Sequence, residues 1–134
     1  MYKKNFNNRY NIGKLEEEKT LPIIIEYFKR NIKQTVKKLD RYDFECDNYK
    51  YELKTRTNKF NDYPTTMIGK DKLDANAILL FKFSDDILAY IEYDEEKFKT
   101  YETKLFTKYK IPKEHIYIPI HDLIKISNSN IYCG

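Results

Sequence analysis

The chain has 134 residues, of which 41% are hydrophobic, 16% aromatic and 34% charged. This length allows one buried core and excludes two independent ones, and the composition excludes a disordered chain. Two cysteines exclude a disulfide framework, and the longest apolar run, Ala77 to Phe81, is too short to cross a membrane. We therefore expect a single domain over residues 1–134, with no membrane partner. We also expect a soluble intracellular protein of the cytoplasm or nucleus that is not secreted.

The segment 13–30 is predicted to form a helix, after a polar start up to about residue 10 that we expect to be a flexible tail. Apolar residues recur along this segment at helical spacing: Leu21, Ile24, Ile25 and Phe28. At this period Glu17 points in nearly the same direction as the apolar residues, whereas Glu16 and Glu18 point about 100° to either side. Glu17 is therefore predicted to face the sheet.

Pro22 leaves two alternatives for this helix. It either kinks a helix that runs through it, or it lies in the first turn of a helix that begins near Thr20, where a missing amide costs little. If Pro22 changes the register of the helix, Glu18 replaces Glu17 as the acidic residue that faces the sheet.

Alternating residues over 36–46 and 49–57 predict two antiparallel strands joined by the turn Asp47-Asn48. A two-residue turn would place Asp43 directly across from Glu52. One face of this hairpin is apolar: Tyr42, Phe44, Cys46, Tyr49, Tyr51 and Leu53. The opposite face is charged: Asp43, Glu45, Glu52, Lys54 and Arg56.

The later segments complete the predicted sheet. In chain order they are a loop over 58–76 with a short helix near 72–76, strands over 77–83 and 87–93, a stretch over 94–109 that suits helix or strand equally, a strand over 115–120, a helical turn capped by Asp122, and a flexible end over 127–134. The strand over 77–83 is apolar enough to lie in the middle of the sheet. The expected fold is α/β, with a central mixed β-sheet and an N-terminal helix packed on it.

The facing carboxylates carry the predicted chemistry. Opposed like charges on a sheet destabilise it by roughly 0.2 to 1 kcal/mol, so a cation is expected between Asp43 and Glu52. Magnesium is usually held by one or two carboxylates, with water and substrate phosphate completing the shell, and the ion would acidify the attacking water. Lys54 shares the face, and we expect it to position this water and stabilise negative charge, with a general-base role as the alternative.

Basic residues follow the hairpin and recur in the next loop, and we expect them to contact nucleic-acid phosphates: Arg56, Lys59, Lys70 and Lys72. The net charge of +4 is compatible with a polyanionic partner but does not demonstrate one, because many proteins without such partners are equally basic. A solvated lysine surface is the alternative interpretation.

At these residues the chain resembles the PD-(D/E)XK, or restriction-endonuclease-like, superfamily. Tyr42-Asp43 stands where the motif has Pro-Asp, and Glu52-Leu53-Lys54 matches its Glu-x-Lys. Gly13 followed by Glu17 is similar to the opening helix of archaeal Holliday-junction resolvases, and 63–72 looks like a loop in nuclease-like proteins of large DNA viruses. The resemblance covers about the first 60 residues. The chain departs from it in having Tyr for the motif's Pro and no evident long helix after the third strand.

This resemblance implies a restriction-endonuclease-like domain that hydrolyses phosphodiester bonds with Mg²⁺ or Mn²⁺. The implied catalytic residues are Glu17, Asp43, Glu52 and Lys54. The implied metal ligands are Asp43, Glu52, Glu17 and the Leu53 carbonyl. DNA is favoured over RNA as the substrate, and a homodimer would suit cleavage of both strands. The alternatives are a nucleic-acid-binding module on the same fold that does not cut, and a protein-interaction domain whose charges only cover its surface.

Overall fold

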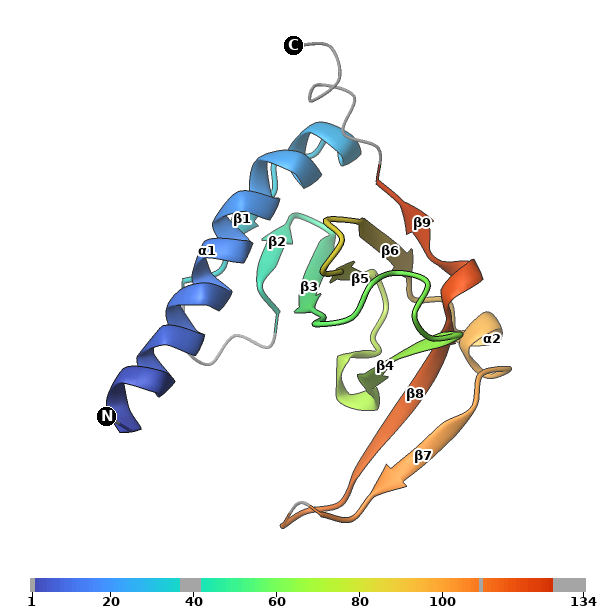
Figure 1. Ribbon diagram of the computed structural model, residues 1–134. Coiled ribbons are helices and arrows are strands. Elements are labelled where there is room, and N and C mark those ends of the chain that lie inside the picture. The colour runs from blue at the N-terminus through green and yellow to red at the C-terminus, as the bar shows by residue number, and fades with distance from the viewer. Residues whose placement is uncertain (1, 37–41, 109, 127–134) are drawn as a thin grey trace.

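The computed structural model describes residues 2–36, 42–108 and 110–126, and for residues 2–12 it describes the backbone alone. These residues form a helix, a six-stranded sheet and a three-stranded sheet. Figure 1 shows the helix on one side of the six-stranded sheet and the three-stranded sheet on the other. The predicted class, α/β with a mixed sheet and an N-terminal helix packed on it, is confirmed.

The helix α1 spans Tyr2–Phe28. The prediction of a flexible start up to residue 10 is therefore wrong, because the backbone of this segment is helical. Pro22 lies inside α1, so the helix does not begin near Thr20. The helix ends before Lys29, whose φ of 56° is left-handed, and the predicted end at Arg30 was two residues late.

The six-stranded sheet is mixed. Its strands in spatial order are β1 (Lys33–Gln34), β2 (Phe44–Cys46), β3 (Tyr49–Thr55), β5 (Ala77–Lys82), β6 (Leu88–Glu92) and β9 (Ile124–Lys125). Strands β3 and β5 run parallel, and every other neighbouring pair is antiparallel. The predicted central strand is confirmed, because β5 lies between β3 and β6 and five of its six residues are buried.

The hairpin β2–β3 has the predicted register. Cys46 pairs with Tyr49 and Phe44 pairs with Tyr51, as a two-residue turn at Asp47-Asn48 requires. The first predicted strand was too long. Residues 33–34 form β1, Val36 lies outside both strands, and residues 37–41 lie outside the described residues.

The second sheet was not predicted. It consists of β4 (Thr65–Gly69), β8 (Lys113–Pro119) and β7 (Thr103–Phe106), in that spatial order and antiparallel throughout. The segment 58–76 is therefore not a loop with a helix near 72–76. It contains β4 and the short 3₁₀ helix η1 (Lys70–Lys72), and η1 ends before Leu73, whose backbone is extended.

The ambiguous stretch 94–109 contains both kinds of structure, the short helix α2 (Glu95–Phe98) and the strand β7. Asp94, not Asp122, caps a helix, because its carboxylate accepts the amides of Glu96 and Lys97. The prediction of a helical turn after Asp122 is wrong. Asp122 is the last residue of the 3₁₀ helix η2 (Ile120–Asp122), and the strand β9, which pairs with β6, follows it.

The six-stranded sheet separates two apolar cores. The core towards α1 is built by Ile24, Ile32, Phe44, Tyr51, Leu53, Ile78, Leu80 and Leu88. The core between the two sheets includes Leu79, Phe81, Phe83, Ile91, Ile68, Ile116 and Ile118. Since residues alternate between the faces of a strand, Glu52, which pairs with Leu79 on the parallel neighbour, lies on the face towards the second sheet.

Strand alternation predicted that Tyr42 and Phe44 lie on the same face, and this prediction is wrong. Tyr42 is buried in the core between the sheets, whereas Phe44 is buried in the core towards α1. The alternation fails because β2 begins only at Phe44, so residues 42 and 43 do not follow the pleat. Within the part of the chain that the structure describes, no helix has the length and apolar character needed to cross a membrane.

Candidate active site

Asp43 lies where β2 stops pairing with β3. The two-residue turn alone predicted that Asp43 pairs with Glu52. This prediction is wrong, because the β2–β3 ladder ends at the Phe44–Tyr51 pair. Its amide instead donates to the Tyr51 carbonyl at 2.9 Å, and its Oδ2 accepts the Leu53 amide at 2.8 Å. The side chain of Asp43 thus satisfies a strand amide that would otherwise lack a partner.

Glu52 is a buried carboxylate held by two lysines. The residue is only 5% exposed. Lys54 Nζ lies 3.3 Å from Glu52 Oε2, and Lys72 Nζ lies 3.5 Å from Glu52 Oε1. Lys54 comes from the same strand, whereas Lys72 comes from η1, which follows β4. Two cations therefore reach one carboxylate, one at each of its oxygens.

The Lys72 side chain is kept in place by Tyr42. The Tyr42 hydroxyl donates to the Lys72 carbonyl at 2.9 Å, and Lys72 Nζ lies 5.5 Å from the centre of the Tyr42 ring. Such a cation–π contact is favourable by about 0.5–1 kcal/mol or more when it is partly desolvated. Tyr42, the residue that replaces the motif's Pro, thereby fixes a basic residue against Glu52.

Glu16 reaches the sheet through Lys82 of β5, with 3.5 Å between Oε2 and Nζ, whereas Glu18 is exposed. Glu17 also faces the sheet, as predicted. Its Oε1 accepts a hydrogen bond from Gln34 Nε2 at 2.9 Å, and Lys14 Nζ lies 3.8 Å from it. Gln34 belongs to β1 and Lys14 to α1, so neither partner of Glu17 belongs to the β2–β3 hairpin. Glu17 therefore lies beside the Asp43 end of the site without contacting Glu52.

All three predicted acidic residues have raised pKa values. For Glu17, Asp43 and Glu52 the largest cause is burial, which disfavours the charged form. The charge of Asp43 further raises the pKa of both glutamates, so the three carboxylates interact. The Leu53 amide and Lys54 lower the pKa of Asp43, and Lys54 and Lys72 lower that of Glu52, but burial outweighs them. Carboxyls whose pKa values are shifted and that repel each other are typical of functional sites.

The predicted metal ligands do not form a complete coordination site in the part of the chain that the structure describes. Among residues 2–36, 42–108 and 110–126, no group of three or more His, Cys, Asp or Glu side chains is placed to hold a metal ion. The oxygen donors at the site are the Asp43 and Glu52 carboxylates, together with the Leu53 carbonyl. The Leu53 carbonyl points to the same side as the Leu53 amide, towards Asp43, because both groups of a strand residue face the same neighbour.

The four predicted phosphate-binding residues separate in space. Lys72 joins the site at Glu52, and Arg56 lies on the same strand face two residues beyond Lys54. Lys70 instead forms an exposed ion pair with Glu114 on β8, with 3.2 Å between Nζ and Oε1. Lys59 is exposed in the segment before β4.

Lys14 and Gln34 were missed as members of the site. Lys14 lowers the pKa of Asp43 and pairs with Glu17, and Gln34 holds Glu17. Lys14 precedes Glu17 by three residues, so helical spacing could have placed it on the same face. The sequence carries no comparable signal for Gln34, because β1 is two residues long and its pairing depends on the tertiary structure.

Searches of protein-family models, of curated proteins and of solved structures found no match to this chain.

Proposed function

We propose that the protein is a divalent-metal-dependent nuclease on a restriction-endonuclease-like fold, which hydrolyses nucleic-acid phosphodiester bonds, with DNA as the favoured substrate. The observation that carries the proposal is the pair formed by half-buried Asp43 and buried Glu52 at the end of the β2–β3 ladder, flanked by Lys54 and Lys72. The motif order Asp, Glu-x-Lys on an antiparallel hairpin supports it as well.

The donor chemistry of the site suits Mg²⁺ or Mn²⁺. Carboxylate and carbonyl oxygens are the ligands of hard cations, and the raised pKa values of Asp43 and Glu52 mean that an added positive charge would be stabilising there. Asp43, Glu52 and the Leu53 carbonyl would hold the ion, with Glu17 next to them. A bound ion supplies acidified water and neutralises charge on the phosphate.

In the proposed reaction, Lys54 and Lys72 stabilise the negative charge that develops on the phosphate. Lys54 and Lys72 each reach one oxygen of Glu52, so both ammonium groups lie where a phosphate bound at Asp43 and Glu52 would develop negative charge. Fixed cations in a partly dry site stabilise that charge without reorganisation. Tyr42 would hold Lys72 in this position through its hydroxyl and its ring.

A nucleic-acid-binding module that does not cut is the second candidate. It is favoured by the same two ion pairs, because Lys54 and Lys72 already neutralise Glu52 and at least one of them must move for a cation to bind both oxygens. This candidate predicts salt-dependent binding of nucleic acid that is indifferent to Mg²⁺.

Cleavage assays with plasmid, linear and single-stranded DNA and with RNA, in Mg²⁺ or Mn²⁺, test the proposal. We expect Glu52→Ala and Lys54→Ala to lower the cleavage rate by roughly 10²-fold or more, because each removes a charge placed at the reacting phosphate. Glu45→Ala is the matched control, since Glu45 is an exposed carboxylate on β2 of the same hairpin. Equal cleavage by wild type, Glu52→Ala and Glu45→Ala would remove this site from the mechanism.

A further inference from the structure

A pocket of about 490 Å³ opens beyond the candidate active site, between the end of β3 and the strand β4. Its lining includes Arg56 and Asn58 from the segment after β3, Tyr63 from the segment before β4, Thr65 and Thr66 from β4 itself, and Tyr117 from β8. Its size is that of a small-ligand site and would admit one nucleotide.

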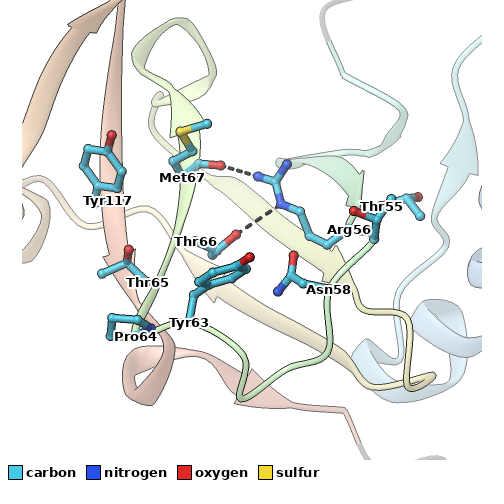
Figure 2. A pocket seen from close by; sticks show the side chains of 10 residues that line it. Thr55, Arg56, Asn58, Tyr63, Pro64, Thr65, Thr66, Met67 and Tyr117 are labelled. Atoms are coloured by element: carbon cyan, nitrogen blue, oxygen red, sulfur yellow. Dashed lines mark hydrogen bonds between the residues drawn. The ribbon is translucent and has the colours of Figure 1, made fainter.

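The only charged side chain among the residues that line the pocket is Arg56. Its Nε donates to Thr66 Oγ1 at 3.1 Å, and its Nη2 donates to the Met67 carbonyl. Figure 2 shows the guanidinium reaching across to β4 through these two bonds. Two of its five N–H groups are used in this way, and no residue that the structure describes accepts a bond from the other three, so these can bind a ligand.

The Arg56 guanidinium is poorly solvated, and its cation–π contact is with the Phe81 ring, whose centre lies 5.4 Å from Cζ. Burial lowers the pKa of the guanidinium, and no neighbouring charge contributes to that shift. Among the residues that the structure describes, Arg56 forms no ion pair with an Asp or Glu. A desolvated arginine normally has an anionic partner, and a phosphate matches its planar fork.

Tyr63 adds an aromatic surface to the lining of the same pocket. Its side chain is 61% exposed, although a large aromatic residue buried in a core would be more stable. In Figure 2 its ring lies next to Asn58 within the pocket lining. Unpaired bases stack on an exposed ring in a pocket that also holds an arginine, whereas a base inside a duplex cannot reach such a ring.

The pocket continues the line of the candidate active site. Glu52, Lys54 and Arg56 are every second residue of β3 and its extension, so their side chains lie on one face of the strand. Successive residues of this set are about 6.6 Å apart along the strand. This spacing is close to that of consecutive phosphates in an extended strand of nucleic acid. A chain whose reacting phosphate lies at Glu52 and Lys54 would thus bring a neighbouring phosphate to Arg56.

We propose that the pocket is a subsite for one unpaired nucleotide of a single-stranded nucleic acid, with its phosphate on Arg56 and its base on Tyr63. The proposal rests on the proposed function only for the position of the reacting phosphate. It specifies the substrate class: a single strand, or an unpaired flank of a duplex, extending past the active site towards β4.

Binding measured without divalent metal tests the subsite separately from the nuclease proposal. The full chain in EDTA is titrated into fluorescent oligo(dT), oligo(U) and duplex DNA of about 12 nucleotides, which covers the usual site sizes. We expect Tyr63→Ala to weaken single-strand binding roughly ten-fold. We expect Arg56→Gln to reduce the slope of log K against log salt by about 0.7, since one phosphate contact is lost. The oligo(dT) and oligo(U) arms compare binding of a DNA strand with binding of an RNA strand.

The controls are Ile111→Ala and Lys110→Gln, which alter an exposed apolar residue and an exposed cation at the turn between β7 and β8. Both should bind like the wild type. Since Tyr63 is exposed, Tyr63→Ala should keep the wild-type melting temperature. Unchanged affinity in Tyr63→Ala together with an unchanged salt slope in Arg56→Gln would overturn the subsite, as would tighter binding of duplex than of single strand. Binding as expected without metal-dependent cleavage would overturn only the nuclease proposal.

Discussion

At the scale of single residues, the most informative feature is the balance of charges on Glu52. Two ammonium groups lie within 3.5 Å of its oxygens, yet its pKa is raised, because burial and the charge of Asp43 outweigh the lysines. The ionised site is therefore a source of instability in the protein without metal. Functional sites often retain such unfavourable charges because they are needed for binding or catalysis.

This balance predicts that Glu52→Gln stabilises the metal-free protein at neutral pH. A carboxyl whose folded pKa is raised binds more protons in the folded state, so its unfavourable contribution is absent below the unfolded pKa of about 4.3 and grows as pH rises through the folded pKa. The variant should melt higher than the wild type by roughly 2–4 °C at pH 7, and the difference should shrink towards pH 4. Thermal melts in EDTA across this range measure it.

The control is Glu96→Gln, because the Glu96 side chain is 84% exposed on α2. It should leave the melting temperature unchanged at every pH. A Glu52→Gln variant that melts below the wild type at pH 7 would mean that the two lysine ion pairs outweigh the burial of the carboxylate.

At the scale of elements, the orientation of α1 decides which acidic residue approaches the hairpin. Ile24 is fully buried against the six-stranded sheet, while its neighbour Ile25 is 37% exposed. Glu17 precedes Ile24 by seven residues, two helical turns, and lies on the same side. Pro22 within the helix does not change this register, so the packing of Ile24 and the position of Glu17 depend on each other.

We therefore predict a large difference between two adjacent substitutions. Ile24→Ala should lower the free energy of unfolding by about 2–5 kcal/mol, because it leaves a cavity in the core towards α1. Ile25→Ala should change it by less than about 1 kcal/mol, since part of that side chain is already in water. Urea denaturation of both variants measures the difference. Equal losses would contradict this orientation of α1 and with it the position of Glu17.

At the scale of the whole molecule, the candidate site joins parts of the chain that are distant in sequence. Glu17 comes from α1 on one face of the six-stranded sheet, and Lys72 comes from η1 after β4 on the other. They approach the same hairpin because β2 stops pairing at Phe44 and opens the edge of the sheet beside β3. Binding of a cation at this edge should consequently stabilise the folded chain as a unit.

We predict that Mg²⁺ or Mn²⁺ raises the free energy of unfolding by about 1.4 kcal/mol at a concentration ten times its Kd. Asp43→Asn should abolish this stabilisation, because the metal then loses one of its two carboxylates. Glu45→Gln, which neutralises an exposed carboxylate of the same hairpin, should retain it. The measurement is the melting temperature as a function of metal concentration. An equal metal response in Asp43→Asn and the wild type would show that cations bind elsewhere.

The sequence by itself determined the features that depend on local spacing. The two-residue turn Asp47-Asn48 set the hairpin register, helical period directed Glu17 towards the sheet, and an unbroken apolar run marked β5 as a central strand. Each of these depends only on neighbours along the chain, where periods of 2 and 3.6 residues act directly. The pairing of Glu52 with Lys54, two residues apart, belongs to the same category.

Only the tertiary structure decided the rest of the site. The strand β4 is short, and its residues are identified as a strand by pairing with β8, about fifty residues later. That pairing carries Lys72 to Glu52, Thr66 to Arg56, and Tyr63 to the rim of the pocket. Tyr42, which lies just before β2, packs between the two sheets. Contacts of this kind depend on how two sheets pack together, and no local period in the sequence encodes that packing.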